Sequence, residues 1–467
     1  MTKNIAYMIA TIIFLTFSIC ITVIPMGLAP KWNGDIPQHR DQYEMITNAF
    51  LKGQLSFLYE PNPELLKLDN PYDPSARSEA GVSFRWDHAL YHDKYYMYFG
   101  VAPVITTFLP YHLIFGENLT TFHATQLYVG LYVIGIFLLF NLICKKFFSK
   151  VNYIIYLISA MVFALISSWV AISTPALYCT ALSAALMFSI YAIYFYMKSV
   201  FDNNLSFNKK IMYATVASFC GALIFASRPN IGIILIVAIP LFITFIKTNK
   251  ITKKDIYKIV IIFMPYLIIG GLLMYYNYLR FDSVFEFGQT YQLTSADQHY
   301  YNNILNNLSI NRINEFIRYN FLIYNGVSNK FPFVSISGIF INFPILIIPY
   351  VLIFTKDFQK FLKKHYLLSL FIILLILPFL ITLLQSVASP YSLVRYRLDF
   401  SFIMVISTFI AIFYMINNDQ KINTYLISIM LLITLIMVIL LFFVPFDENF
   451  TAYFPKIIQA INKFFFL

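Results

Sequence analysis

The chain has 467 residues, of which 59% are hydrophobic and only 12% are charged. Soluble proteins carry roughly a quarter charged residues, so the composition excludes an ordinary water-soluble protein and favours lipid as the solvent. The net charge of +11 would suit a nucleic-acid-binding protein if it formed one basic face. Most lysines instead stand in short segments between apolar runs, which is typical of membrane insertion. We therefore expect a lipid bilayer, and no nucleic acid, as a partner.

Eleven apolar runs are long enough to cross a membrane as helices. Each holds about 17–25 residues, which at about 1.5 Å per residue matches a hydrocarbon core of about 30 Å. The sequence therefore predicts an all-α polytopic membrane protein with about eleven transmembrane helices, in a single domain over residues 1–467. The runs cover residues 5–28, 124–144, 152–173, 175–198, 211–227, 230–246, 258–279, 336–354, 366–385, 399–416 and 423–445.

The distribution of lysine predicts the orientation of these helices. With the N-terminus in the cytoplasm, all five inner connections are rich in lysine, whereas the short outer connections near Thr174 and Arg228 nearly lack it. Short cytoplasmic loops of membrane proteins are enriched in Lys and Arg, so this orientation is the expected one. It leaves two long outer loops, residues 29–123 and 280–330, in which we expect short helices and functional residues.

Two apolar segments need a separate interpretation. Residues 5–28 are too long for the apolar region of a signal peptide and lack a clear cleavage site, so we expect a retained anchor. Residues 101–116 are broken by Pro103 and Pro110, which predicts a re-entrant or interfacial segment. The four cysteines show no CxxC spacing, which indicates small buried side chains and neither disulfides nor a zinc site; they are Cys20, Cys144, Cys179 and Cys220.

The first outer loop opens with a short amphipathic helix that begins at Asp41 and ends at Gly53. Asp41 and Glu44 have the spacing of a capping box, so Asp41 caps the helix in one interpretation. In the other, its carboxylate is a general base at the membrane surface. The residue pattern alone leaves both open. The apolar face is formed by Tyr43, Ile46, Ala49 and Phe50.

Aromatic residues gather further along the same loop. Trp86, Tyr95 and Tyr96 are typical of a platform that stacks on sugar rings, and equally of the aromatic belt at a membrane surface. His88 and His92 are four residues apart, which on a helix would place two metal ligands on one face. No glutamate motif accompanies them, so the pattern gives little support for a metal.

Arginine residues stand at several predicted outer helix ends. Arg228, Arg395 and Arg397 would be expensive at this depth unless paired or functional. A guanidinium group binds phosphate with two parallel hydrogen bonds, so these residues are candidates for holding a lipid phosphate. Contact with ordinary anionic headgroups is the alternative. Arg280 and Glu286 continue the same chemistry in the second outer loop.

Taken in order, several motifs resemble the GT-C superfamily of membrane glycosyltransferases, which includes protein O-mannosyltransferases and lipid A aminoarabinose transferases. They are similar above all to a group of bacterial multi-spanning proteins described as glycosyltransferases, and the resemblance covers most of the chain. It implies a GT-C-like fold in the bacterial cytoplasmic (inner) membrane. The motifs are DQYEMITNAFLKG, NPYDPSAR, RWDHALYHDKYYMYFG, FLPYHLIFG, FASRPN, LRFDSVFEFGQTYQL and RYRLDF.

The resemblance also implies a reaction. A sugar would pass from a polyprenyl-phosphate donor to a cell-envelope glycan or glycolipid acceptor on the outer face, with inversion. The family's acidic base maps to Asp41, and we expect Asp87 and Glu286 to be supporting acids. The family often has an adjacent acidic pair, but Gln42 follows Asp41 here, so Asp35 and Asp87 remain rivals for the base.

The same resemblance implies that outer-face arginines hold the lipid phosphate and that the second outer loop contacts donor or acceptor. The substrate-binding set is then Arg228, Arg395, Arg397, Trp86, Tyr95, Tyr96 and Arg280. No cofactor is certain, and a divalent metal is left open. A transporter or flippase of lipid-linked saccharides, or a glycan polymerase, is the alternative function. Against a transporter, few charged residues fall inside the apolar runs.

Overall fold

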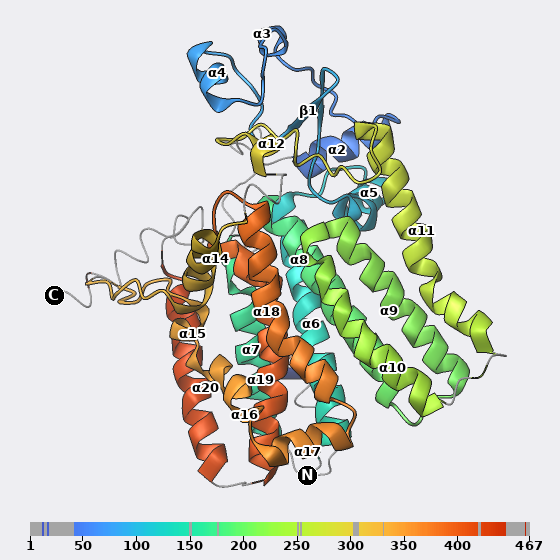
Figure 1. Cartoon of the computed structure of the whole chain (residues 1–467), viewed down its shortest axis with the longest axis vertical. Helices are drawn as coiled ribbons and strands as arrows, with labels where there is room; N and C mark the ends of the chain where they lie inside the picture. The colour runs from blue at the N-terminus through green and yellow to red at the C-terminus, as the bar shows by residue number, and fades with distance from the viewer. Residues whose placement is uncertain are drawn as a thin grey trace.

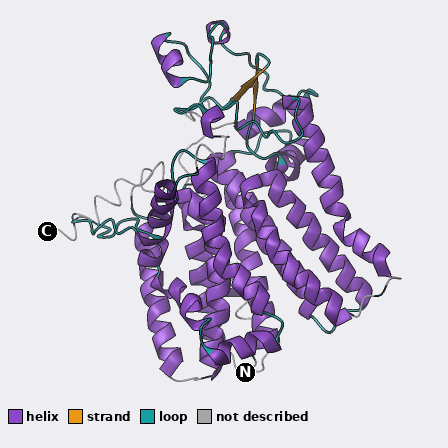
Figure 2. Ribbon diagram, viewed as in Figure 1, coloured by secondary structure: helices purple, strands orange, loops and turns teal. Residues whose placement is uncertain are grey.

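A bundle of long helices carries a smaller cap at one end in the computed structural model (Figures 1 and 2). It describes residues 12–13, 16–17, 42–148, 152–174, 177–249, 252, 255–301, 308–329, 331–418, 422–444 and 463. Among these residues, nine helical segments are long and apolar enough to cross a membrane. The predicted all-α polytopic membrane protein is therefore confirmed. The predicted first span, residues 5–28, lies almost entirely outside the described residues.

The spanning segments coincide with the predicted apolar runs in nine cases. Two of them begin with a 3-10 turn that continues into an α-helix. They are α6 (Thr121–Phe147), α7 (Tyr153–Ser173), α8 (Leu177–Phe201), α9 (Phe207–Ser227), η2 (Pro229–Val237) with α10 (Ala238–Asn249), α11 (Ile256–Phe281), α18 (Leu368–Ala388), η6 (Val394–Arg397) with α19 (Leu398–Asn418), and α20 (Ile422–Leu441).

One predicted helix differs from the structure. Residues 336–354 form three short pieces, α15 (Ile339–Asn342), η5 (Pro344–Ile347) and α16 (Ile348–Leu352), instead of one continuous span. Proline lacks the N–H that a helix interior requires and clashes with the preceding turn, which explains breaks at Pro344 and Pro349. The run is apolar enough to cross a membrane, but its prolines prevent one continuous helix.

Burial separates the centre of the bundle from its edge. In the apolar window of the η6–α19 segment, 94% of the residues are buried inside the protein, against 6% in α11. The α19 helix packs against α7, α8 and α18, whereas α11 contacts mainly α9 at the edge of the bundle (Figure 1). Apolar side chains that the protein leaves uncovered on α11 face the lipid in a membrane.

The cap is built from both predicted long loops. The first loop supplies α2 (Gln42–Leu51), α3 (Pro63–Leu66), α4 (Pro74–Glu79), the strands β1 (Ala89–Tyr91) and β2 (Lys94–Tyr96), η1 (Val104–Phe108) and α5 (Leu109–Phe115). The second loop supplies α12 (Gln298–Tyr301). The remaining short helices are α14 (Ile310–Ile317), η4 (Arg318–Leu322) and α17 (Lys356–Lys364).

The helix α2 follows its sequence pattern. Tyr43, Ile46 and Ala49 are fully buried in the core of the cap, and Gly53 ends the turn with φ +72°. The carboxylate of Glu44 accepts a hydrogen bond of 3.0 Å from the Thr121 N–H, in the first turn of α6. A negative charge is favourable at a helix N-terminus, so Glu44 joins the cap to the bundle. Asp41, its predicted partner in a capping box, lies outside the described residues.

The region of His88 and His92 is not helical, which corrects the prediction that they share a helical face. Strands β1 and β2 pair antiparallel with Leu90 opposite Tyr95, and His92 lies in the turn between them. His92 and Asp93 both have positive φ, as the tight turn of a hairpin requires. The two histidines are therefore separated by a strand.

The segment Val104–Phe115 is apolar but too short to cross a membrane. Its last side chains are strongly exposed: Leu113 by 69%, Ile114 by 73% and Phe115 by 63%. The helix begins directly after Pro103 and continues through Pro110, where it changes from a π-helix to an α-helix, so the predicted break at Pro110 is not complete. The interfacial position of the segment stays a prediction. Its exposed apolar side chains, at the junction of cap and bundle, support it.

Candidate functional site

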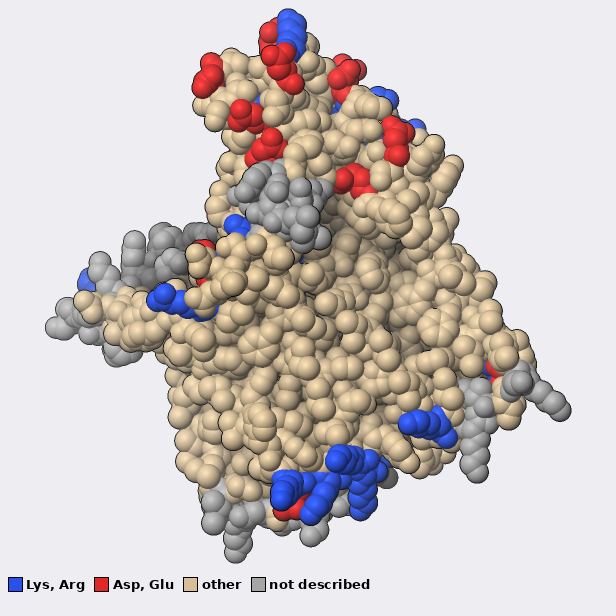
Figure 3. Space-filling model, viewed as in Figure 1, with Lys and Arg blue, Asp and Glu red and all other residues tan. Residues whose placement is uncertain are grey.

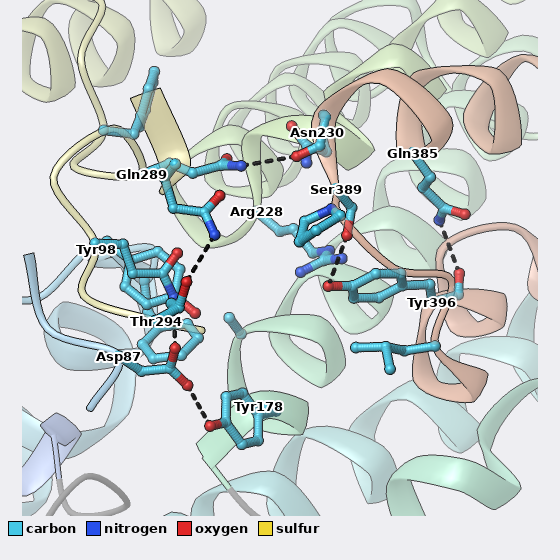
Figure 4. Close-up of a pocket in the computed structure, with 18 of the residues that line it drawn as sticks. Asp87, Tyr98, Tyr178, Arg228, Asn230, Gln289, Thr294, Gln385, Ser389 and Tyr396 are labelled. Carbon is cyan, nitrogen blue, oxygen red and sulfur yellow. Dashed lines mark hydrogen bonds between the residues drawn. The ribbon is translucent and has the colours of Figure 1, made fainter. Parts of the chain in front are cut away.

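A cavity of about 400 Å³ lies between the cap and the adjoining ends of the spanning helices (Figure 4). Segments that are far apart in the sequence meet around it. They are residues 86–87 and 98–100 of the first loop, the start of α8 at Tyr178, the α9–η2 junction at 227–230, the second loop between residues 287 and 298, and residues 385–396 from the end of α18 into η6.

A glycine makes this meeting possible. A Cβ atom at Gly100 would lie 2.0 Å from the Ser227 carbonyl oxygen and 2.4 Å from that of Ala226. Only glycine allows the first loop to approach the C-terminal end of α9 so closely. The loop therefore reaches the helix end at the residue before Arg228.

Asp87 is held in one orientation at the wall of the cavity. Its φ is +56°, an unfavourable conformation for a non-glycine residue that the surroundings must impose. Its N–H donates to the Leu293 carbonyl (3.0 Å), and its own carbonyl accepts from the Gln42 side chain (2.9 Å). Its carboxylate accepts hydrogen bonds from Gln292 Nε2 (2.7 Å) and from the Tyr178 hydroxyl.

His88 supports the backbone next to Asp87. Its ring is fully buried, and Nδ1 lies 2.8 Å from the Trp86 carbonyl oxygen. A carbonyl can only accept, so Nδ1 carries the proton, and Nε2 then accepts from the Tyr59 hydroxyl at 2.5 Å. Both ring nitrogens are used inside the cap, which leaves His88 unsuited to bind a metal.

The described residues contain no group of three or more His, Cys, Asp or Glu side chains placed to hold a metal ion. His92, in the hairpin turn, lies 3.8 Å from Asp282 on the protein surface. Asp35 and Asp41 lie outside the described residues. A divalent metal therefore stays an open prediction.

Arg228 faces the cavity from the opposite side, where α9 ends. Its Nε and Nη2 donate to the two carboxylate oxygens of Asp399 at 3.1 and 3.0 Å, and Gln385 donates to the same carboxylate at 2.9 Å. Asp399 stands in the first turn of α19 and is 1% exposed. The remaining nitrogen of Arg228, Nη1, donates no hydrogen bond within the described part of the chain. The ion pair therefore fixes the guanidinium and leaves the two N–H groups of Nη1 for a ligand.

Arg395 is the second arginine on the cavity wall. Its guanidinium carbon lies 4.4 Å from the centre of the Tyr178 ring, and this tyrosine also donates to Asp87. Tyr178 thus contacts both the acidic and the basic group, and Figure 4 shows its hydrogen bond to Asp87. Desolvation raises the pKa of the Tyr98 hydroxyl well above its usual value, and the Asp87 carboxylate raises it further. Tyr98 is therefore a neutral hydroxyl on the same wall.

Two predicted substrate-binding arginines lie elsewhere. Arg397 is buried and donates to the Ser337 carbonyl (2.6 Å) and the Tyr319 carbonyl (2.9 Å). Arg280 is buried and donates to the Met97 carbonyl (2.6 Å) and to Asn277 (2.9 Å). Neither lines the cavity. Both tie loops to helices, because a buried guanidinium satisfies several carbonyls at once.

The other predicted site residues divide in the same way. Trp86 lines the cavity and is 37% exposed. Tyr95 and Tyr96 are buried in the core of the cap, and Tyr96 packs on Phe281 with ring centres 5.4 Å apart. Glu286 does not line the cavity, and it accepts hydrogen bonds from Gly288 and Thr290 of its own loop.

Several residues of the site were not predicted from the sequence. Tyr178 and Gln292 are neutral polar residues without a recognisable spacing. Asp399 could have been found in the sequence, because a carboxylate inside an apolar span needs a cationic partner. Arg228 is one of the few cations available. The sequence could have suggested that pair.

The similarity of this chain to known proteins is limited to the fold of one solved structure. Neither a protein-family profile nor a curated protein sequence matches the chain. Among solved structures it is similar to the Archaeoglobus fulgidus oligosaccharyltransferase in the apo form, with 11% sequence identity and a TM-score of 0.47. The match covers 94% of this chain and 55% of that one, so this chain spans about half of that protein's length. Similarity of this size does not establish a shared activity.

The two neighbouring arginines of η6 should respond differently to replacement. Arg397→Ala leaves the buried Ser337 carbonyl without its donor, which costs about 1–3 kcal/mol. We expect a clearly lower melting temperature of the detergent-solubilised protein, measured by light scattering or size-exclusion chromatography after heating. Arg395→Ala, on the cavity wall, should lower it less. Equal melting temperatures for Arg397→Ala and the unchanged protein would show that Arg397 does not anchor these loops.

Proposed function

We propose that the protein is a membrane glycosyltransferase that moves a sugar from a polyprenyl-phosphate donor to a glycan or glycolipid acceptor of the cell envelope. The observation that supports this most is that Asp87, Arg228 and Arg395 line one cavity. That cavity lies where the apolar bundle meets the polar cap. A lipid-linked donor and a water-soluble acceptor can meet at such a place.

The positive charges of Arg228 and Arg395 can stabilise the leaving group of this reaction, which is the lipid phosphate. When the bond between the sugar and the phosphate breaks, negative charge develops on the phosphate oxygens. Arg395 and the remaining Nη1 of Arg228 would stabilise it, and Asp399 would keep Arg228 in place. The polyprenyl chain would lie against the apolar bundle.

A carboxylate on the cap side can accept the proton of the attacking hydroxyl. The acceptor hydroxyl would attack the anomeric carbon from the face opposite the phosphate, which inverts the configuration, and its proton would pass to a carboxylate within hydrogen-bond reach. Two acids are candidates for this base. Asp87 lines the cavity, and Asp41 is the residue that the family resemblance indicates. Glu286, bonded within its own loop, is proposed to shape that loop.

Replacing each candidate base by its amide separates the two. The base must titrate, so Asp→Asn at that position should lower transfer at least about a hundredfold while membrane abundance is unchanged. Asp93→Asn is the matched control, because Asp93 is exposed in the hairpin turn and asparagine tolerates its positive φ. The measurement is mass analysis of envelope glycans together with a transfer assay.

Each outcome of this comparison has one meaning. Loss of transfer in Asp87→Asn alone makes Asp87 the base, and loss in Asp41→Asn alone makes it Asp41. Full activity in both variants would contradict an acidic base in the first loop.

We also propose that the cap faces the outside of a bacterial inner membrane and that the N-terminus is cytoplasmic. Acidic side chains gather over the cap, and a cluster of basic side chains lies at the opposite end of the bundle (Figure 3). The helix α17 contributes four lysines to the basic side, as the enrichment of Lys and Arg in cytoplasmic loops requires.

Cysteine labelling tests this orientation. An impermeant thiol reagent added outside intact cells should label Ser295→Cys, in the cap, and should miss Thr252→Cys at the other end of the bundle. Both positions are exposed, and Cys144, Cys179 and Cys220 are buried, so the background from these three should be low. Labelling of Thr252→Cys alone would reverse the orientation and remove the proposed outer-face reaction.

A further inference from the structure

A second cavity, of about 340 Å³, lies within the cap beside the first. Its walls come from α4, the segment that follows α4, and the second loop. Trp86, Thr294 and Ser295 line both cavities, so the two spaces share a wall. All of the residues around the second cavity belong to the cap, and none to a spanning helix.

The side chains of this cavity suit a sugar ring. The rings of Trp86 and Phe84 have centres 6.3 Å apart, and Trp86 remains 37% exposed. Flat aromatic faces pack well against the C–H faces of a pyranose, and the polar edge of the indole can hydrogen-bond a hydroxyl. Ser78, Thr294 and Ser295 add polar atoms around the aromatic surface, as is usual in ligand pockets.

Arg77 gives an independent sign of a ligand. Its side chain lines the cavity and is 2% exposed, with its guanidinium carbon 4.4 Å from the centre of the Phe84 ring. Its terminal nitrogens donate to the carbonyls of Pro71 and Thr294. Its Nε has no hydrogen-bond partner in the described part of the chain. A buried N–H without a partner is unfavourable, and a hydroxyl of a ligand that reaches Nε would satisfy it.

We propose that the second cavity is an acceptor subsite, which binds the sugar unit next to the one that carries the attacking hydroxyl. This rests on the proposed glycosyltransferase function, and it makes the acceptor an oligosaccharide or polysaccharide. The acceptor is favoured over the donor because the donor's polyprenyl chain must stay with the apolar bundle, whereas the second cavity is formed by the cap alone. Trp86 lies between the reacting unit and the next one.

Binding of free saccharides to the purified full-length chain tests the subsite without any transfer. The chain has three tryptophans, Trp32, Trp86 and Trp169. With Trp32→Phe and Trp169→Phe, the fluorescence reports on Trp86 alone. The probes are lipid-free disaccharides of glucose, galactose, mannose and N-acetylglucosamine in α and β linkages. We expect a saturable change in fluorescence with at least one of them.

A pair of variants on α4 assigns the binding to this cavity. Ser78 lines the second cavity and not the first, so Ser78→Tyr should fill it and weaken disaccharide binding at least tenfold. Ser75 is exposed on the same helix and lines neither cavity, so Ser75→Tyr should bind like the parent. Similar melting temperatures of the two variants exclude a folding defect.

Two results would overturn the subsite. One is no response of Trp86 to any of the disaccharides, and the other is equal binding by Ser78→Tyr and Ser75→Tyr. Failure of the proposed function looks different. In that case saccharides would still bind, and the unchanged protein would transfer no sugar in the assay used for Asp41→Asn and Asp87→Asn.

Discussion

The pairing of two long loops through their backbones is the interaction on which the site depends. The N–H of Asp87 donates to the carbonyl of Leu293, and the N–H of Leu293 donates to the carbonyl of His88. A further bond joins Leu90 to Tyr291. These bonds hold Asp87 in its positive-φ conformation and set its carboxylate beside Gln292. Without them Asp87 would lose the backbone contacts that join it to the second loop above the ends of the spanning helices.

A second constraint acts from the bundle. The bidentate pair of Arg228 with Asp399 joins the end of α9 to the start of α19, the most buried of the spanning segments. Removing one partner of such a pair leaves a buried charge and costs about 3–5 kcal/mol. The pair therefore stabilises the bundle and also fixes one cation of the cavity. Cap and bundle each bring a rigid charged group to a common space.

The sequence predicts the parts of this molecule that depend on the length of an apolar run or on the helical spacing of apolar residues. Apolar runs located nine spans, and the helical period located the buried face of α2. The prediction of a helical face was wrong at His88 and His92, because a spacing of four residues fits a hairpin as well as a helix. Arginines were predicted as a group, but only tertiary packing sends Arg395 to the cavity and Arg397, two residues later, into the protein.

The proposed function requires that the cavity between cap and bundle bind a lipid phosphate together with an acidic residue on its wall. The most direct test is a cryo-electron microscopy structure of the full chain in lipid nanodiscs with a polyprenyl phosphate added. We expect a phosphate between Arg228 and Arg395, within hydrogen-bond distance of at least one guanidinium, with the carboxylate of Asp87 across the cavity. A phosphate bound at another place on the protein, with this cavity empty, would contradict it.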